Sequence, residues 1–221
     1  MSVSAANAVR KPEELTWRAA AALPYAGLTA YEAVRDVGRV GDGSRVLVHG
    51  GGGAVGSLAI QLSRIFGAAH VLATCSASDL ARVKAYGARA VDYRDPRGLA
   101  DVVDGGERFD VVLDMCNGGD AVLEASLPAM APGSRYVTLN GPLLHRMDEF
   151  GLAAGGVVAA AELAERKWRL SHGPEISYDW CLYHPCGDRL ATLAGLAADG
   201  RLDVHVDRTV YPYALGGTLV W

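Results

Sequence analysis

The residues of this sequence whose spacing most clearly serves chemistry are the glycines between positions 50 and 56. The strand-like segment Arg45 to His49 runs into Gly51-x-Gly53-x-x-Gly56, directly before a helical pattern. In such a loop the first glycine permits a tight turn, the second lets backbone approach a pyrophosphate, and the third lets helix pack closely on strand. The N–H groups that open the helix then attract phosphate oxygens. The expected contacts come from Gly51, Gly52, Gly53, Ala54, Val55 and Gly56. The alternative is a glycine-rich turn that binds nothing.

The end of the second expected strand decides which nucleotide is bound. An acidic residue there would hydrogen-bond a ribose 2′-hydroxyl and repel a 2′-phosphate. The strand ends Thr74-Cys75-Ser76, and no carboxylate occurs before Asp79. We therefore predict NADPH, with Ser76 hydrogen-bonding the phosphate, although Arg82 lies farther along the chain. The missing acid also argues against an S-adenosylmethionine methyltransferase. In the alternative reading, Ser76 is an ordinary solvated loop residue.

The elements that position this loop alternate between strand and helix signals from residue 44 to about residue 140. Such alternation predicts an α/β fold with a doubly wound, Rossmann-type parallel sheet and helices on both faces. The predicted strands are Arg45–His49, His70–Cys75, Ala90–Tyr93, Phe109–Asp114 and Arg135–Leu139. The clearest helix is Ala54–Phe66, where apolar residues recur at helical spacing and Gly67 follows as a stop.

Outside this region the pattern is weaker. Pro12–Val37 predicts two helices joined at Leu23–Pro24, since proline tends to end a helix at the preceding residue. Helices are also expected at 153–169 and 187–198, an irregular segment at 176–186, and a last strand at 204–211. The chain has the pattern of one truncated at both ends.

Composition excludes several classes of function. Half of the 221 residues are hydrophobic, the net charge is −4, and there are only three lysines, so nucleic acid is not an expected partner. The four cysteines are too scattered for a disulfide framework. No apolar run reaches the roughly 20 residues of a membrane span. No targeting segment can be identified near the N-terminus.

Other catalytic motifs are missing or incomplete. The segment Cys181-x-x-His184-x-Cys186 lacks a fourth ligand at tetrahedral-site spacing, so no metal is predicted. Neither the Gly-x-Ser-x-Gly hydrolase motif nor the Tyr-x-x-x-Lys pair of short-chain reductases occurs. No catalytic acid can be named.

Several segments together resemble the medium-chain dehydrogenase/reductase superfamily. They are the run from Leu23 to Tyr31, the glycine loop, Leu72–Ser76, Asp114-x-x-x-Gly118 and Gly133–Val137. The chain looks like a zinc-independent quinone oxidoreductase, because Tyr25 stands where zinc-dependent relatives place a catalytic cysteine. Tyr136–Leu139 and the later aromatic stretch most resemble a mitochondrial branch of this family.

The resemblance implies roles for further residues and divisions of the chain. Ser76 and Tyr93 would surround the adenosine phosphate, while Met115, Leu139 and Thr29 would lie toward the ribose and nicotinamide. As alternatives, Met115 and Leu139 are core residues and Tyr93 is a surface aromatic. Residues 1–30 would be a remnant of a GroES-like catalytic domain, 31–203 the NADPH-binding domain, and 204–221 an incomplete return strand.

The implied activity is hydride transfer from NADPH to a quinone or other conjugated carbonyl. The resemblance also implies a role in ubiquinone metabolism, a mitochondrial location and a possible protein partner. Two other hypotheses stay open at this point. One is a truncated fragment that binds nucleotide or a protein partner without turnover, and the other is a nucleotide-sensing module.

Overall fold

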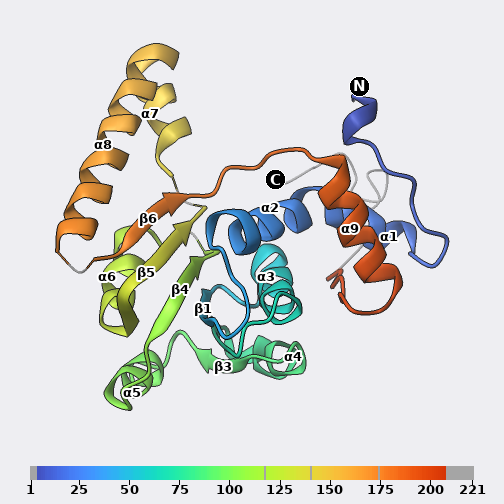
Figure 1. Cartoon of the computed structure of the whole chain (residues 1–221), viewed down its shortest axis with the longest axis horizontal. Coiled ribbons are helices and arrows are strands. Elements are labelled where there is room, and N and C mark those ends of the chain that lie inside the picture. The colour runs from blue at the N-terminus through green and yellow to red at the C-terminus, as the bar shows by residue number, and fades with distance from the viewer. Residues whose placement is uncertain (1–3, 117, 140, 174, 208–221) are drawn as a thin grey trace, which may run out of the picture.

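A computed structural model describes residues 4–116, 118–139, 141–173 and 175–207 (Figure 1). Its six strands are β1 (Arg45–His49), β2 (His70–Cys75), β3 (Arg89–Asp92), β4 (Phe109–Asp114), β5 (Met130–Thr138) and β6 (Ser177–Trp180). All pair in parallel, in the order β3-β2-β1-β4-β5-β6. The predicted α/β class and doubly wound parallel sheet are confirmed.

Helices connect the strands. Those in the first half are η1 (Ala5–Asn7), α1 (Trp17–Ala22), η2 (Leu23–Gly27), α2 (Leu28–Tyr31), η3 (Glu32–Val37), α3 (Ala54–Ile65), η4 (Ala77–Asp79) and α4 (Leu80–Ala85). Those in the second half are α5 (Gly98–Asp104), α6 (Gly119–Ser126), η5 (Leu127–Ala129), α7 (Leu143–Phe150), α8 (Leu152–His172) and α9 (Gly187–Ala198). Of the described residues, none belongs to a helix both long and apolar enough to cross a membrane.

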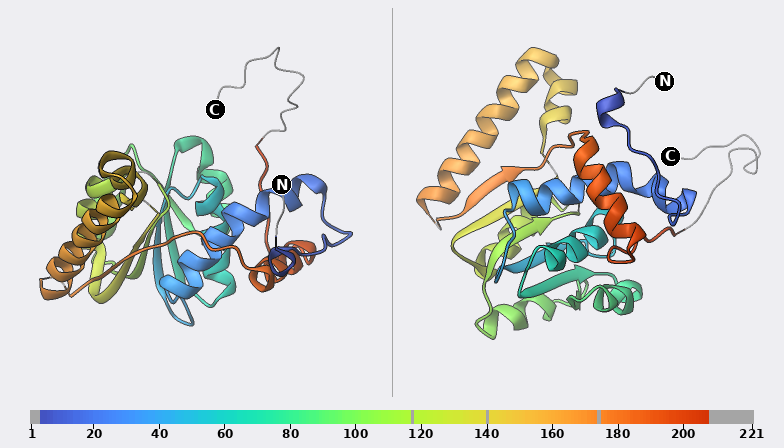
Figure 2. Two further views of the ribbon diagram at one scale, coloured as in Figure 1. Left: turned by 90° about the horizontal axis from the view of Figure 1, so that it is seen from above. Right: turned by 45° about the vertical axis from the view of Figure 1, so that its right-hand side comes forward.

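The central strands are buried on both faces, and their alternate residues supply two separate cores. On β1, Val46 and Val48 face the core under α2, α3 and α9, while Leu47 faces the core under α5, α6 and α8. Successive side chains of a strand point to opposite faces, so one strand feeds both cores. Figure 2 shows the two helical layers on either side of the sheet.

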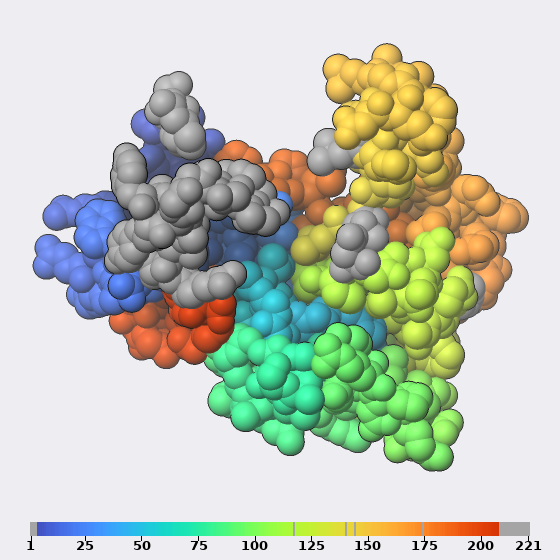
Figure 3. All heavy atoms as spheres, turned by 180° about the vertical axis from the view of Figure 1, so that it is seen from behind, coloured from blue at the N-terminus to red at the C-terminus, as the bar shows by residue number. Residues whose placement is uncertain are grey.

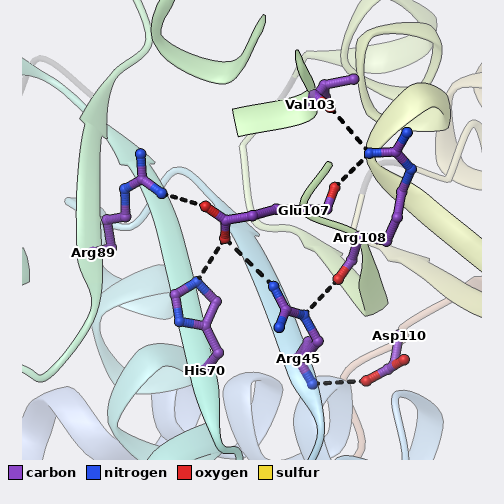
Figure 4. Close-up of polar contacts among 7 residues, drawn as sticks. All are labelled: Arg45, His70, Arg89, Val103, Glu107, Arg108 and Asp110. Carbon is purple, nitrogen blue, oxygen red and sulfur yellow. Dashed lines mark hydrogen bonds and ion pairs between the residues drawn. The ribbon is translucent and has the colours of Figure 1, made fainter. Parts of the chain in front are cut away.

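The amino edge of the sheet is tied by one carboxylate. Glu107 lies just before β4, and its carboxylate oxygens contact side-chain nitrogens of the first residues of three strands (Figure 4). The N···O distances are 2.5 Å to Arg89, 3.2 Å to His70 and 3.5 Å to Arg45. The backbone N–H of Arg45 also donates to Asp110 at 2.8 Å. These contacts fix the amino ends of β1 to β4, opposite the edge that carries the glycine loop.

The N-terminal helices differ from the prediction. The two expected helices form one helical stretch from Trp17 to Val37, without a break at Pro24. Pro24 lies at the start of the π-helical turn η2. Pro24 has no N–H to donate, and the change from α-helical to π-helical bonding at η2 accommodates it within the stretch. The predicted domain division at residue 30 falls inside this stretch and stays a prediction.

The second half shows two further differences. Residues 176–186, expected to be irregular, contain β6, which pairs with β5 from Arg135–Ser177 to Thr138–Trp180. The helix predicted at 153–169 extends over all of α8, and α7 precedes it. The tip of this helical pair rises clear of the body (Figure 3). Of the predicted last strand, residues 204–207 are not in a strand, and the rest lies outside the described residues.

Candidate functional site

A cavity of about 530 Å³ lies at the carboxyl ends of β1, β2 and β4. The strand order reverses between β1 and β4, and this switch point is where doubly wound sheets bind their ligands. The lining residues are His49, Gly50, Gly52, Gly53, Thr74, Cys75, Ser76, Asp79, Tyr93, Cys116, Gly118 and Val122.

The glycine loop turns tightly against β2 before α3 begins. Gly50 has φ +76°, the Gly51 N–H donates to the Thr74 carbonyl at 2.8 Å, and the Gly53 N–H donates to the Gly50 carbonyl at 3.0 Å. A Cβ on Gly51 would lie 2.9 Å from the Ala73 Cβ. One on Gly56 would overlap the Gly50 carbonyl group. The absence of side chains is therefore required at these two positions.

Four of the predicted cofactor residues line the cavity: Gly52, Gly53, Ser76 and Tyr93. Gly51, Ala54, Val55 and Gly56 complete the loop and the first turn of α3 beside them. Tyr93 is 60% exposed, and Arg94 lies over its ring.

The other three predicted residues lie outside the cavity lining. Met115 follows β4 and its N–H donates to the His49 carbonyl at 3.1 Å, while Leu139 follows β5 and its N–H donates to the Asp114 carbonyl at 3.3 Å. Both side chains are half-buried against the core. Thr29 is buried in α2, and its hydroxyl donates to the Tyr25 carbonyl at 2.8 Å.

An acidic side chain that sequence reasoning placed beyond the site reaches into it. The η4 turn brings Asp79 back to the cavity, where it accepts a hydrogen bond from Ser76 at 2.6 Å and pairs with Arg82. Arg82 also donates to the Gly52 carbonyl at 2.9 Å. The hydrogen bonds from Ser76 and from Arg82 hold the pKa of Asp79 below its usual range, so its carboxylate is ionised at neutral pH.

His49 forms the buried floor of the cavity. Its Nε2 lies 2.9 Å from the Ser126 hydroxyl and its Nδ1 lies 3.1 Å from the Thr74 hydroxyl. Because the Ser126 hydroxyl donates to the Val122 carbonyl, its oxygen accepts from Nε2–H, and Nδ1 then accepts from Thr74. Burial lowers the His49 pKa from 6.5 to about 4, against the opposing effect of Asp114. The ring is neutral at physiological pH.

Asp114 organises a second buried network beside His49. One oxygen accepts from Tyr136 at 3.1 Å and Thr138 at 2.9 Å, and the other accepts from the Cys116 N–H at 3.2 Å. Burial, followed by the charge of Asp114, raises the pKa of Tyr136 and raises that of the Cys116 thiol to about 11. The thiol in the cavity is therefore protonated and a poor nucleophile.

Neither His49 nor Cys116 was predicted as a site residue. His49 ends an apolar strand and Cys116 is an isolated cysteine, so neither belongs to a recognisable motif. Only the parallel pairing of β1 with β4, whose partners are 65 positions apart in the sequence, brings them together. The signal that the sequence offered was position: His49 ends one predicted strand, and Cys116 follows the end of another.

The described residues do not fit a metal centre. Within them no group of three or more His, Cys, Asp or Glu side chains is arranged to hold an ion. His184 pairs with Glu32 at 2.8 Å, and Cys181 is buried. The ring of Tyr25 packs against that of Tyr183 at 5.1 Å.

A second cavity, of about 440 Å³, lies beside α6 and α8 and is lined mainly by charged side chains. Its arginines are paired within the protein: Arg146 contacts Glu162 at 2.7 Å and Arg166 contacts Asp120 at 2.6 Å. It lacks the glycine cradle and the strand-end position of the first cavity. We therefore place the functional site at the glycine loop.

A parallel sheet with a glycine loop, a helix N-terminus and a cavity at its switch point defines a dinucleotide-binding domain. The chain belongs to the zinc-binding dehydrogenase family, whose model matches residues 86–214. The predicted medium-chain dehydrogenase/reductase relationship is confirmed.

Similar proteins include Reticulon-4-interacting protein 1, mitochondrial, of Caenorhabditis elegans, 33% identical over 91% of this chain and 55% of the relative. A mitochondrial NAD(P)H oxidoreductase of Bos taurus is 32% identical over 96% of this chain and 54% of the relative. The quinone oxidoreductase from Coxiella burnetii superposes with a TM-score of 0.67 at 26% identity, covering 90% of this chain and 55% of that one. The chain thus spans about half the length of the relatives it matches.

Proposed function

We propose that this chain forms the cofactor-binding part of an NADPH-dependent oxidoreductase that transfers a hydride to a quinone or other conjugated carbonyl. The observation that carries the proposal is the glycine loop, closed on β2 and open to the cavity at the switch point. The family relationship supports a nicotinamide cofactor. Names of relatives, among them a mitochondrial NAD(P)H oxidoreductase and a chloroplast envelope quinone oxidoreductase homolog of Arabidopsis thaliana, support the reaction class.

Each part of the site would have a distinct task. The N–H groups at the start of α3 and the side-chain-free loop would hold the pyrophosphate. Ser76 and Arg82 would meet the 2′-phosphate of the adenosine ribose, and Tyr93 would cover that end. The nicotinamide supplies the hydride when it is bound. The neutral, hydrogen-bonded His49 would fix the floor of the cavity without exchanging a proton near neutral pH.

The names of the relatives extend the proposal to location and partners. Both the C. elegans and the B. taurus relatives are named mitochondrial, and the former is named for its interaction with a reticulon. From these names we infer a mitochondrial location and a protein partner; the family resemblance, and not the name of a relative, is the ground on which we propose a role in ubiquinone metabolism. We also retain the division into residues 1–30, 31–203 and 204–221, with the central part binding the cofactor.

The first test is calorimetric titration of the purified chain with NADPH and with NADH. The proposal predicts saturable binding of both and tighter binding of NADPH. Oxidation of NADPH by a water-soluble short-chain quinone is then followed by its absorbance.

Three outcomes separate the hypotheses. Binding with quinone-dependent oxidation supports the full proposal. Binding without oxidation identifies a nucleotide-binding module and overturns the catalytic part for this chain. A chain that is folded by circular dichroism and binds neither cofactor contradicts the site itself.

A further inference from the structure

Two side chains that the proposed function assigns to the 2′-phosphate are already engaged with a carboxylate of the same protein. Ser76 donates to one oxygen of Asp79 at 2.6 Å, and Arg82 pairs with the other. A phosphate at this end of the cavity would require the same two donors. The donors of the proposed phosphate site are therefore already paired within the protein.

The arrangement is held in place by the glycine loop. Arg82 donates to the Gly52 carbonyl at 2.9 Å, and a Cβ on Gly52 would overlap the Asp79 carboxylate. The side chains of Arg82 and Asp79 are only 23% and 26% exposed. Asp79 and Gly52 both line the cavity. The ion pair thus lies against the loop that binds the pyrophosphate, and not on the outer surface of α4.

We propose that Asp79 is a specificity-determining residue that competes with the 2′-phosphate of NADPH for Ser76 and Arg82. This inference rests on the proposed function, because it assumes that the cavity receives the adenosine end of a nicotinamide dinucleotide. Binding of NADPH displaces the carboxylate from its donors and brings two negative groups together, so Asp79 reduces the preference for NADPH that Ser76 and Arg82 provide without abolishing it. Binding of NADH leaves the pair intact, and the carboxylate accepts a hydrogen bond from the 2′-hydroxyl.

The substitution Asp79→Asn tests the competition directly. Asparagine keeps the size of the side chain and accepts from Ser76, but it removes the charge that holds Arg82 and repels phosphate. We expect NADPH to bind about tenfold more tightly, since like-charge contacts at a binding site are strongly unfavourable. NADH should not gain affinity: its dissociation constant should rise, or change by less than about threefold, because only one hydrogen bond is altered.

The matched control is Asp101→Asn. Asp101 pairs with Arg97 at 2.9 Å on α5, away from the cavity, so the variant has the same change of charge and also loses an Asp–Arg pair. Its dissociation constants for both cofactors should equal those of the parent chain. Adenosine 2′,5′-bisphosphate and adenosine 5′-monophosphate serve as probes of the adenosine end alone, and only the former should gain affinity in Asp79→Asn.

A second variant keeps the test decisive if Asp79→Asn folds poorly. Arg82→Gln should weaken NADPH by at least about tenfold and NADH by much less, since it removes a charged phosphate donor. In the double variant the gain from Asp79→Asn should be smaller than in the parent background, because the repulsion of the phosphate is still relieved but no guanidinium is released to bind it.

Several results would overturn the inference. A ratio of NADPH to NADH dissociation constants that stays within threefold of the parent in Asp79→Asn would do so. Equal weakening of both cofactors by Arg82→Gln would do the same. Failure of the proposed function has a different signature: the parent chain, folded by circular dichroism, would then bind neither cofactor and neither adenosine probe.

Discussion

Replacing Gly56 by alanine tests whether the close approach of α3 to the glycine loop holds the cofactor site together. The added Cβ would lie 2.8 Å from the Gly50 carbonyl carbon and 3.0 Å from the Gly51 Cα. Both neighbours are backbone, so no side chain can rotate away to relieve the overlap. The loop and the helix must move apart, and the N–H groups that face the cavity move with them.

The expected loss of stability follows from two opposing effects. Overpacking of a rigid site costs about 3 kcal/mol at the upper end of its range. Alanine recovers about 1 kcal/mol through its better helix propensity. The net loss is roughly 2 kcal/mol, which lowers the Tm of a domain of this size by about 4–8 °C. We also expect NADPH to bind at least about tenfold more weakly, the equivalent of about 1.4 kcal/mol.

The assay is a thermal melt followed by circular dichroism, with calorimetric titration of NADPH. Gly195→Ala is the matched control, because Gly195 lies within α9 and an added Cβ would meet no atom within 4 Å. That variant should gain about 0.5–1 kcal/mol and bind NADPH as the parent does. If Gly56→Ala melts no lower than the parent and binds NADPH equally well, the close-approach argument is wrong.

Three further predictions follow from the buried and ionic groups. Burial lowers the pKa of His49 from 6.5 to about 4, so the unfolded chain binds the extra proton and about 3 kcal/mol of stability is lost as the pH falls from 6.5 to 4. The free energy of unfolding, measured with denaturant between pH 4 and 7, should therefore depend less steeply on pH in His49→Gln than in the parent. An equal dependence would contradict the lowered pKa of His49. Glu107→Gln weakens two partly exposed ion pairs, with Arg45 and Arg89, and a contact with His70. The substitution should cost about 1 kcal/mol, and less in high salt; a loss that does not depend on salt would argue against an ionic origin. The Cys116 pKa of about 11 should make alkylation by iodoacetamide at pH 8 roughly a hundredfold slower than in the denatured chain. Peptide mass spectrometry measures the ratio of the two alkylation rates, and a ratio near one would refute the prediction.

Much of the sheet was predictable because its central strands are apolar and lie between glycine turns. β1, β2 and β4 have the predicted bounds. β6 was missed because its four residues, Ser177–Trp180, carry too short a pattern, and its pairing with β5 depends on residues 42 positions away. The break expected at Pro24 was wrong because local proline rules take no account of a π-helical turn that accommodates the ring.

The site was predictable only where a contiguous motif encodes it. The order of strand, glycine loop and helix located, without any tertiary information, the loop that we propose binds the pyrophosphate. Asp79 was placed beyond the site because its distance along the chain gave no indication that η4 folds it back over Gly52. His49 and Asp114 meet only through strand pairing, which the sequence does not record. Motifs therefore located the cavity, whereas tertiary contacts determine its charge.

The central position of β1 also constrains how the protein acquires its structure. β1 pairs with β2 and β4, and the β4 partners of Val46 to His49 are Val111 to Asp114. During synthesis, β1 therefore lacks one neighbour until the β4 residues, 65 positions farther along the chain, have been made. Non-local parallel pairing of this kind slows folding. The cavity lies at the ends of all three strands, so it is complete only after β4 has joined β1, and a nicotinamide cofactor bound there would stabilise only chains in which that pairing has already formed.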